Sequence, residues 1–451
     1  MIKPEIFKAN DIRGVAQGDK LEWDAEGAFA LGAALVDTWD LVSAEGGLVL
    51  GRDMRVTSPE LSAAFTKGVL SRGADVVDIG LASTDELWFA SGRLGLPGAM
   101  FTASHNPGQY NGIKFCRSGA RPISPAQLRE VAERAMGDPP VPAAAAGERT
   151  EMDLLPAYAD HLHSLVDLSG IRRLTVVADA GNGMAGHTLP AVLGPENLDL
   201  IGLYTDPDGT FPNHAPNPLE PENLVDAQAA VREHGADLAL VFDGDADRCF
   251  IIDERGEVVS PSAVTAMIAS QELKREPGAT IVYNTITSRS VAEVVKELGG
   301  ISVQTRVGHT FVKAAMAENN AIFGGEHSGH YYFRDFWSAD TGMLAALHVL
   351  ALAGATAAPL SSLMTDYARY AESGEINSRV LDPTMIMERI AAAFGDRGEL
   401  DRTDGLTVSG ADWWVNVRSS NTEPLLRLNV EARTLDEMAA LRDETLALIR
   451  R

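Results

Sequence analysis

The sequence predicts an α/β protein in which three similar α/β domains with mixed, mainly parallel sheets are followed by a C-terminal α+β domain. Two observations indicate this fold. Short apolar runs alternate with helical patterns three times along the chain, and such alternation is typical of parallel sheets covered by helices. From about residue 371 the pattern changes to strand, helix, three strands and a final helix. We expect the domains to span residues 1–148, 149–256, 257–368 and 369–451.

The first repeat contains expected strands at residues 48–50, 74–79 and 99–101. Its helices are expected to begin at caps, with Ser58 before Pro59 for one helix and a capping box of Ser83 and Glu86 for the other. The last of the three strands leads into the loop Thr102-Ala103-Ser104-His105-Asn106-Pro107. A Pro- and Ala-rich stretch after this repeat suits an exposed linker.

The second repeat contains expected strands at residues 174–178, 198–203 and 236–242, and it ends in a hairpin at 251–260. The third contains expected strands at residues 280–283, 301–303 and 321–323, and a capping box of Ser290 and Glu293 is expected on one helix. In the C-terminal domain we expect strands at 412–417 and 425–430 and a last helix that begins at Thr434. Open α/β sheets bind ligands at the carboxyl ends of their strands, so the polar residues that follow each third strand are expected to carry the chemistry.

Composition and charge disfavour several classes of partner. The 451 residues carry a formal net charge of −25, which argues against nucleic acid and anionic membranes because both are bound through a basic excess. The two cysteines are too few for a disulfide framework, which fits a reducing compartment. The chain does not begin with an apolar secretion signal, and the apolar segment 342–359 is expected to be a buried helix rather than a membrane span. We therefore expect a cytoplasmic protein.

Ser104 is a candidate nucleophile. It follows an apolar run and precedes Asn106, Pro107 and Gly108, which favour a tight turn. A serine in this position would lie at the carboxyl end of a strand, where the active and binding sites of open α/β sheets are found. The alternative for so short a motif is a loop that only builds a turn.

Three carboxylates stand at alternate positions in Phe242-Asp243-Gly244-Asp245-Ala246-Asp247-Arg248. In an extended segment they would project to one side and converge on a hard cation, for which Mg²⁺ is the better choice. An EF-hand does not fit, because Arg248 occupies the position that requires Gly and strand patterns flank the loop. An acidic loop without a cation is the remaining alternative.

Two further loops carry groups suited to a sugar phosphate. Between Gly324 and the end of its loop, Glu326, Ser328 and His330 can hydrogen-bond vicinal hydroxyls. The loop Arg418-Ser419-Ser420-Asn421-Thr422-Glu423-Pro424 combines a guanidinium with hydroxyls and a turn-forming Asn, an arrangement that can hold phosphate. Taken alone, each loop is also compatible with a polar surface turn.

Taken together and in this order, the four motifs resemble those of the α-D-phosphohexomutase superfamily over essentially the whole chain. The loop with Ser104 resembles the phosphoserine loop, and the loop from Asp243 to Arg248 resembles the metal loop. The loop with Glu326 resembles the sugar-recognition loop, and the loop with Arg418 resembles the phosphate-binding loop. The amino-acid sequences of these two loops are most like those of bacterial phosphomannomutases and phosphoglucomutases. The phosphoglucosamine mutase branch usually has a Pro-Ser-Gly-Thr version of the last loop. The resemblance implies four domains around a central cleft.

The resemblance also implies a role for each candidate residue. The catalytic residues would be Ser104, Lys114, Arg13 and His309. The metal ligands would be Ser104, Asp243, Asp245 and Asp247. The substrate-binding residues would be Arg248, Glu326, Ser328, His330, Arg418, Ser420, Asn421 and Thr422. Within this set Ser104 would carry the transferred phosphoryl group, and Lys114 would act as general acid or base.

The implied function is the interconversion of mannose 6-phosphate and mannose 1-phosphate through a phosphoserine and a bound hexose 1,6-bisphosphate, with glucose phosphates as further substrates to be tested. The implied cofactors are Mg²⁺ and a hexose 1,6-bisphosphate activator, and the partners are small hexose phosphates, with no nucleic acid and no membrane. A monomer or a homodimer is expected. The alternatives are a phosphoglucomutase or phosphoglucosamine mutase of the same superfamily, a metal-dependent phosphatase, and a sugar-phosphate sensor.

Overall fold

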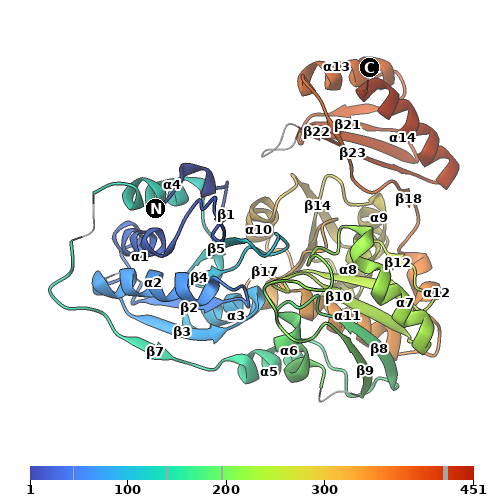
Figure 1. The fold of residues 1–451 in the computed structure, drawn as a ribbon. Coiled ribbons are helices and arrows are strands. Elements are labelled where there is room, and N and C mark those ends of the chain that lie inside the picture. The colour runs from blue at the N-terminus through green and yellow to red at the C-terminus, as the bar shows by residue number, and fades with distance from the viewer. Residues whose placement is uncertain (44, 139–140, 195–196, 420–424, 451) are drawn as a thin grey trace. The chain divides into compact units, whose positions relative to one another are not determined.

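The computed structural model describes all residues except 44, 139–140, 195–196, 420–424 and 451 (Figure 1). The chain forms two compact units. Unit 1 contains Met1–Val259 and Ser328–Leu363, and unit 2 contains Ser260–His327 and Met364–Arg451. Residues of the predicted third domain therefore belong to both units, and the four predicted domain boundaries stay predictions. The predicted α/β class is confirmed, because each unit combines mixed or antiparallel sheets with helices.

The first sheet of unit 1 is mixed. Its strands are β1 (Asp11–Val15), β2 (Leu48–Arg52), β3 (Val76–Leu81), β4 (Gly98–Phe101), β5 (Tyr110–Arg117), β6 (Arg121–Pro122) and β7 (Arg149–Glu151). They lie in the order β1-β5-β4-β2-β3-β7, with β6 paired to β5. The strand β2 is parallel to β3 and β4, whereas β5 is antiparallel to both β4 and β1. Because β2 and β4 are parallel neighbours, the loops that follow them meet at the same edge of the sheet.

Helices cover this sheet. They are α1 (Ala25–Trp39), α2 (Ser58–Ser71), α3 (Thr84–Leu94) and α4 (Pro125–Ala135), preceded by the short helix η1 (Pro4–Ile6). Side chains of α1, α2 and α4 share one hydrophobic core with the strands. Burial of this apolar surface is the main term that holds the sheet and its loops in place.

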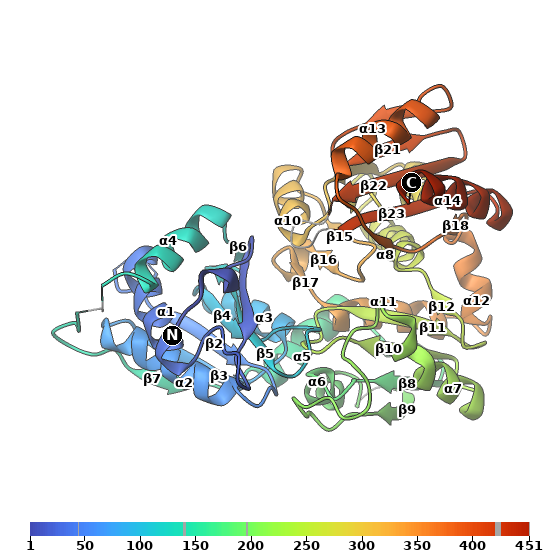
Figure 2. The ribbon, with the colours of Figure 1, turned by 45° about the horizontal axis from the view of Figure 1, so that its top comes forward.

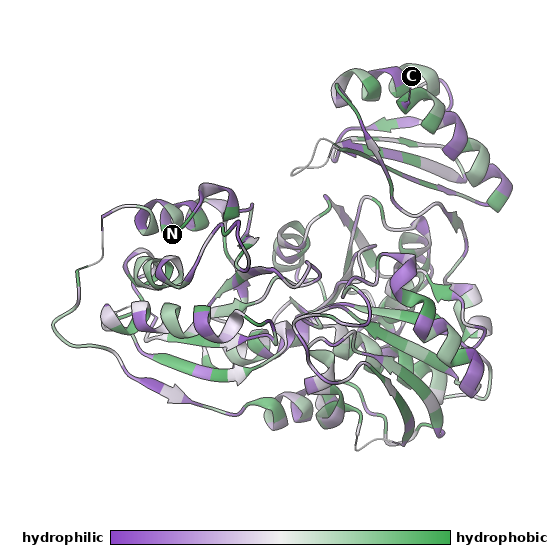
Figure 3. Ribbon diagram, viewed as in Figure 1, coloured by the Kyte–Doolittle hydropathy of each residue, from purple (hydrophilic) through white to green (hydrophobic). Residues whose placement is uncertain are grey.

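The second sheet of unit 1 has the order β12-β11-β10-β8-β9. Its strands are β8 (Leu174–Asp179), β9 (Leu198–Leu203), β10 (Leu238–Phe242), β11 (Cys249–Asp253) and β12 (Val258–Val259). The strands β8, β9 and β10 are parallel, and β10, β11 and β12 are antiparallel, which confirms the predicted hairpin. The helices of this region are α5 (Leu155–Leu165), α6 (Ala185–Val192), η2 (Pro221–Leu224) and α7 (Val225–His234). Figure 3 shows the central strands of this sheet mostly in the colour of hydrophobic residues, as expected for strands that are covered on both faces.

Residues 260–363 contribute to both units. In unit 2, the parallel strands β13 (Thr280–Asn284), β14 (Ile301–Thr305) and β15 (Phe323–Gly325) are accompanied by α8 (Pro261–Arg275), α9 (Arg289–Glu297) and α10 (His309–Glu318). In unit 1, β16 (Tyr331–Phe333) and β17 (Ala339–Asp340) form an antiparallel pair, with η3 (Arg334–Phe336), α11 (Gly342–Gly354) and α12 (Leu360–Leu363). Most of α11 is buried, which confirms the predicted buried helix. Among the described residues we find no helix that has both the length and the apolar character of a membrane span.

The C-terminal part of unit 2 is an antiparallel α+β layer, as predicted. Its strands are β18 (Ala371–Glu372), β19 (Ile376–Arg379), β20 (Glu399–Asp401), β21 (Leu406–Ser409), β22 (Trp413–Ser419) and β23 (Leu425–Ala432), and the short helix η4 (Met364–Asp366) precedes them. They lie in the order β18-β23-β22-β21-β20, with β19 on β23. The helices α13 (Pro383–Phe394) and α14 (Leu435–Ile449) pack on this sheet around a separate core (Figure 2).

Two of the predicted caps are confirmed. The Ser83 hydroxyl accepts a hydrogen bond from the backbone N–H of Glu86 at the start of α3. The Thr434 hydroxyl accepts one from the backbone N–H of Glu437 at the start of α14. Both cysteines are free and buried.

Two other caps were predicted one or two residues too late. Thr57 precedes α2, and Ser58 is the first residue of the helix; its hydroxyl donates to Asp53 at 2.6 Å and accepts from Asn111 Nδ2 at 2.9 Å. Ser288, not Ser290, is the cap of α9, and its hydroxyl accepts from the Ser290 N–H. Both caps have a second hydroxyl residue one or two positions away in the sequence, and capping preference alone does not separate the two candidates.

Candidate active site

Ser104 lies just beyond the end of β4, at the carboxyl edge of the first sheet, as predicted. Its side chain is buried, and its backbone φ of +50° lies in the left-handed region that serine rarely adopts. The Ser104 Oγ donates to Asp243 Oδ2 at 2.9 Å and lies 3.2 Å from Nδ1 of His105. The Ser104 N–H donates to Thr102 Oγ1 at 2.9 Å. The serine hydroxyl is therefore fixed against a carboxylate that comes from another sheet.

The acidic loop, residues 243–248, follows β10. It is a turn and not the extended segment predicted, and Ala246 has a φ of +63°. The carboxylates converge nevertheless, because ligand oxygens of Asp243, Asp245 and Asp247 lie within 4.8 Å of one another. A Cβ on Gly244 would lie 2.5 Å from the backbone oxygen of Ser104, so a glycine is needed where this loop meets the serine.

Lys114 brings a positive charge to the acidic loop from β5. Its Nζ donates to Asp245 Oδ2 at 2.7 Å and to Asp247 Oδ2 at 2.5 Å. Burial lowers the pKa of Lys114, but the charges of Asp245 and Asp247 outweigh this effect and raise the pKa well above its ordinary value. Burial likewise disfavours the ionised form of Asp245, but Lys114 outweighs it and holds the pKa of that carboxyl well below its ordinary value. Lys114 is therefore an ammonium ion across the neutral pH range.

Arg248 neutralises the third carboxylate. Its Nε donates to Asp243 Oδ2 at 2.9 Å, and its Nη2 donates to His105 Nδ1 at 2.8 Å. Because a guanidinium can only donate, the His105 Nδ1 is the acceptor. Burial and the charge of Arg248 lower the pKa of His105 well below its ordinary value, so this ring is neutral. Burial raises the pKa of Asp243 to about 7 against the lowering effect of Arg248.

The acidic loop fits a hard divalent cation. In the described part of the chain, the three buried carboxylates form ion pairs with two lysine or arginine side chains, Lys114 and Arg248, and burial of such an excess of negative charge is costly. Oδ1 of Asp245 and Oδ1 of Asp247 are buried and make no hydrogen bond within the described part of the chain. An all-oxygen set of this kind is suited to Mg²⁺. A divalent cation would satisfy these oxygens and balance the charge.

Arg13, on β1, reaches the serine loop, residues 102–110, from the side. Its Nη1 donates to Asn106 Oδ1 at 2.9 Å, and its Nη2 donates to Asp11 Oδ2 at 2.7 Å. The antiparallel pairing of β1 with β5 places Asp11 opposite Lys114 and so brings Arg13 to the loop. The structure thus joins Arg13, Lys114, Ser104 and the acidic loop in one site of unit 1.

Ser328 and His330 also belong to this site. The Ser328 Oγ and the His330 Nδ1 are 2.8 Å apart, and the His330 Nε2 lies 3.7 Å from Asp247 Oδ1. A backbone bridge between Arg248 and His330 holds the two segments together. Ligand atoms of Asp247, His330 and Asp340 form a second close group, and Asp340 was not singled out from the sequence.

The predicted catalytic residue His309 and the other predicted substrate-binding residues lie in unit 2. His309 is the first residue of α10, after Gly308. The buried Glu326 accepts from Asn284 Nδ2 at 3.0 Å and from the Gly308 N–H at 3.2 Å. Arg418, on β22, donates to Glu375 Oε2 at 2.6 Å. Ser420, Asn421 and Thr422 lie outside the described residues.

Sequence reasoning missed two residues that support the site. Thr84 donates from its hydroxyl to Asp245 Oδ2 at 2.6 Å, and its N–H donates to the Asp245 backbone oxygen at 3.0 Å. Arg55 donates to four backbone oxygens of the serine loop. Its only sequence signal is a charged cluster after the apolar strand β2, which is common at strand ends.

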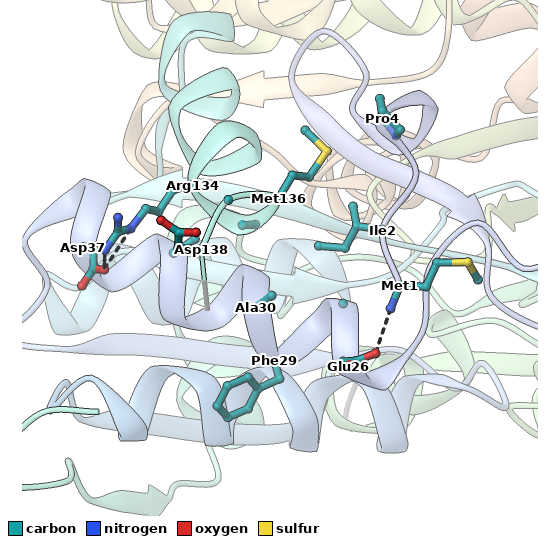
Figure 4. A pocket seen from close by; sticks show the side chains of 14 residues that line it. Met1, Ile2, Pro4, Glu26, Phe29, Ala30, Asp37, Arg134, Met136 and Asp138 are labelled. Carbon is teal, nitrogen blue, oxygen red and sulfur yellow. Dashed lines mark hydrogen bonds and ion pairs between the residues drawn. The ribbon is translucent and has the colours of Figure 1, made fainter. Parts of the chain in front are cut away.

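A cavity of about 530 Å³ lies elsewhere in unit 1, between the N-terminal segment, α1 and the end of α4 (Figure 4). Figure 4 shows apolar side chains such as Ile2 and Met136 along it, and the ion pair between Asp37 and Arg134 lies at one side. None of its lining residues belongs to the site around Ser104. A mainly apolar lining does not suit a doubly charged sugar phosphate.

Residues 4–138, 156–256, 260–370 and 375–448 match, in this order, domains I, II, III and the C-terminal domain described as phosphoglucomutase/phosphomannomutase. The chain belongs to the phosphoglucomutase/phosphomannomutase family. It is 43% identical over 445 residues to a phosphomannomutase of Salmonella typhimurium and 41% identical to one of Escherichia coli, in each case over 96% of both chains. A phosphoglucomutase/phosphomannomutase family structure from Burkholderia thailandensis has 31% identity and a TM-score of 0.89, covering 100% of this chain and 98% of that one.

Membership of this family identifies the class of reaction that the protein catalyses. The protein is a phosphohexomutase, an isomerase of carbohydrate metabolism that acts on hexose phosphates. The family uses Mg²⁺, and the acidic cluster of this chain has the oxygen ligands that such an ion needs. The predicted family resemblance is confirmed.

Proposed function

We propose that this phosphohexomutase is a phosphomannomutase, which interconverts mannose 6-phosphate and mannose 1-phosphate through a phosphorylated Ser104 and a bound hexose 1,6-bisphosphate. The observation that carries the proposal is the Ser104 Oγ, 2.9 Å from a carboxylate oxygen of a buried acidic cluster. The relatives with 43% and 41% identity, which are named phosphomannomutases, support the choice of sugar.

In the proposed reaction the phosphoryl group leaves the Ser104 Oγ and bonds to the free hydroxyl of the hexose monophosphate. The sugar hydroxyl loses its proton and the serine oxygen gains one. The bound bisphosphate then reorients in the site, and its other phosphoryl group is transferred to Ser104. Mg²⁺, held by Ser104, Asp243, Asp245 and Asp247, would supply charge neutralisation to the transferred group, which is the main requirement of phosphoryl transfer.

We assign Lys114 to proton handling. Its ammonium form is strongly favoured by two carboxylates, so it enters the cycle as an acid that can protonate the departing serine oxygen. Arg13 holds the serine loop through Asn106, and Arg248 neutralises Asp243. These contacts support the proposed roles of both residues as positioning charges.

The residues of unit 2 are proposed to hold the sugar phosphate. Glu326 is assigned to the sugar hydroxyls, and His309 to the catalytic set as a supporting charge. Arg418, Ser420, Asn421 and Thr422 are assigned to the phosphate that does not react, with Ser328 and His330 completing the substrate-binding set from unit 1. We further propose that a hexose 1,6-bisphosphate activates the enzyme, and that the protein works in the cytoplasm as a monomer or homodimer.

The test combines phosphopeptide mapping with product analysis. Protein exposed briefly to glucose 1,6-bisphosphate should carry phosphate on the Ser104 peptide, and added mannose 1-phosphate should remove it and yield mannose 6-phosphate. Ser104→Ala should carry none and make no product. Free phosphate in stoichiometric yield would instead establish a phosphatase, and binding without turnover would establish a sensor. Parallel assays with glucose 1-phosphate and glucosamine 1-phosphate decide the preferred sugar.

A further inference from the structure

Arg55 is a fully buried arginine in the turn that follows β2. Every N–H of its guanidinium has an acceptor. Nε donates to Asp53 Oδ2 at 3.1 Å. The other four bonds run to backbone oxygens of the serine loop, at 2.7 Å to Ser104, 2.7 Å to Asn106, 2.8 Å to Pro107 and 3.0 Å to Tyr110.

This arrangement fixes the shape of the loop. Buried carbonyl groups need donors, and here one planar guanidinium supplies several at fixed angles. Arg55 is itself held in place, because Asp53 also accepts from the Arg55 N–H at 3.0 Å and from the Ser58 hydroxyl at 2.6 Å. The ring of Phe211, from the second sheet region, lies 5.1 Å from the Arg55 guanidinium. The side chain therefore has little freedom to move away from the loop.

The constraint reaches the reacting atom through Ser104. Its carbonyl oxygen is bound by Arg55, and its N–H is bound by Thr102 Oγ1, so the backbone is anchored on both sides of the Cα. Ser104 is held at a φ of +50°, a conformation that persists for a non-glycine residue only where the surroundings enforce it. In that conformation its Oγ contacts Asp243.

We propose that Arg55 is a positioning residue for phosphoryl transfer, which holds the backbone of the serine loop so that the Ser104 Oγ stays directed at the acidic loop. The inference rests on the proposed role of Ser104 as phosphoryl carrier. Arg55 acts only through the loop, since its donors are all used by protein acceptors. A lysine at this position cannot replace it, because one ammonium has three donors and no planar fork.

The test is Arg55→Lys, compared with Val69→Ala as a control. Val69 lies on α2, fully buried in the core of the same sheet, and it belongs neither to the serine loop nor to the turn that carries Arg55, so its truncation lowers stability while the groups that Arg55 binds are all retained. For Arg55→Lys we expect kcat to fall about 100-fold, the cost of a misplacement of about 1 Å, while KM for mannose 1-phosphate changes by less than about threefold. Val69→Ala should keep kcat within about twofold at a temperature where it is folded.

A second readout is the rate at which glucose 1,6-bisphosphate phosphorylates Ser104 in a single turnover, which should fall in parallel with kcat. If Arg55→Lys does not fold, Asp53→Asn is used, which keeps the four bonds to the loop but loosens the guanidinium, and about a tenfold loss of kcat is expected. If the wild type never carries phosphate on Ser104, the proposed function fails. If the wild type is phosphorylated and the folded variant is phosphorylated equally fast with unchanged kcat, the inference about Arg55 is overturned while the proposed function stands.

Discussion

Replacing Lys114 by methionine tests whether the acidic loop is built for a divalent cation. The substitution keeps an unbranched side chain and removes the ammonium that lies 2.7 Å from Asp245 Oδ2 and 2.5 Å from Asp247 Oδ2. Removing one partner of a buried ion pair typically costs about 3–5 kcal/mol, because the other charge is left without compensation. The Lys114 side chain is 17% exposed, so we expect a value near the lower end, about 3 kcal/mol in the presence of EDTA.

Mg²⁺ should reverse most of this loss. The variant has one positive charge less beside the same carboxylates, so it should bind the cation more tightly than the wild type does. A ligand at 100 times its Kd stabilises a folded protein by about 2.7 kcal/mol. The wild type gains stability from Mg²⁺ as well, so the gap between the two proteins shrinks by RT ln of the ratio of their Kd values. We expect the variant to bind Mg²⁺ about 30-fold more tightly, which narrows the gap from about 3 to about 1 kcal/mol in excess Mg²⁺, although activity stays low because Lys114 is assigned to proton handling.

The assay is urea unfolding of both proteins in EDTA and in Mg²⁺, with Arg149→Met as the matched control. Arg149 makes an exposed ion pair with Asp78, so its loss should cost less than about 1 kcal/mol and should not depend on Mg²⁺. The reasoning is refuted if Lys114→Met costs less than about 1 kcal/mol in EDTA, or if its cost is the same with and without Mg²⁺.

Three further substitutions give separate tests. Thr84→Val removes the hydrogen bond to Asp245 Oδ2, and activity titrations should show about a tenfold higher Mg²⁺ requirement; an unchanged titration would contradict this. Gly244→Ala places a Cβ 2.5 Å from the backbone oxygen of Ser104, so kcat should fall at least about 100-fold, and a kinetically normal variant would show that the loops need not approach so closely. Glu86→Gln tests the pH dependence of stability. Burial and the charge of Asp85 raise the pKa of Glu86 to about 8. Wild-type stability should therefore fall as pH rises from about 4 to about 8, the interval between the pKa values of the unfolded and folded states. The variant should lose this slope and be more stable than the wild type by about 4–5 kcal/mol at pH 9, because each pKa unit between about 4.5 and about 8 corresponds to about 1.36 kcal/mol. Urea unfolding at pH 5, 7 and 9 that shows parallel curves would rule it out.

Local patterns determined the elements and the linear motifs. The apolar runs predicted β8, β9 and β10 closely, and Thr434 marked the start of α14, because burial and capping depend on residues near in sequence. Ser104 and the alternating aspartates were found for the same reason, since each motif lies within a few residues at a strand end. The predicted extended conformation of the acidic loop was wrong, because the turn depends on the left-handed backbone of Ala246 and on close packing against the serine loop.

Contacts between distant segments were decided only by the tertiary structure. In the sequence, Lys114 looks like an ordinary surface charge. In the folded protein it binds Asp245, because β5 of the first sheet lies next to the loop that follows β10 of the second sheet. Arg55 and Thr84 leave no motif, because each acts through a backbone or a carboxylate that is far away in sequence. The sequence by itself thus determined which groups can do the chemistry, through short-range patterns. Only the packing of two sheets determined how those groups are charged, oriented and held, because burial and ion pairing depend on every segment that surrounds them.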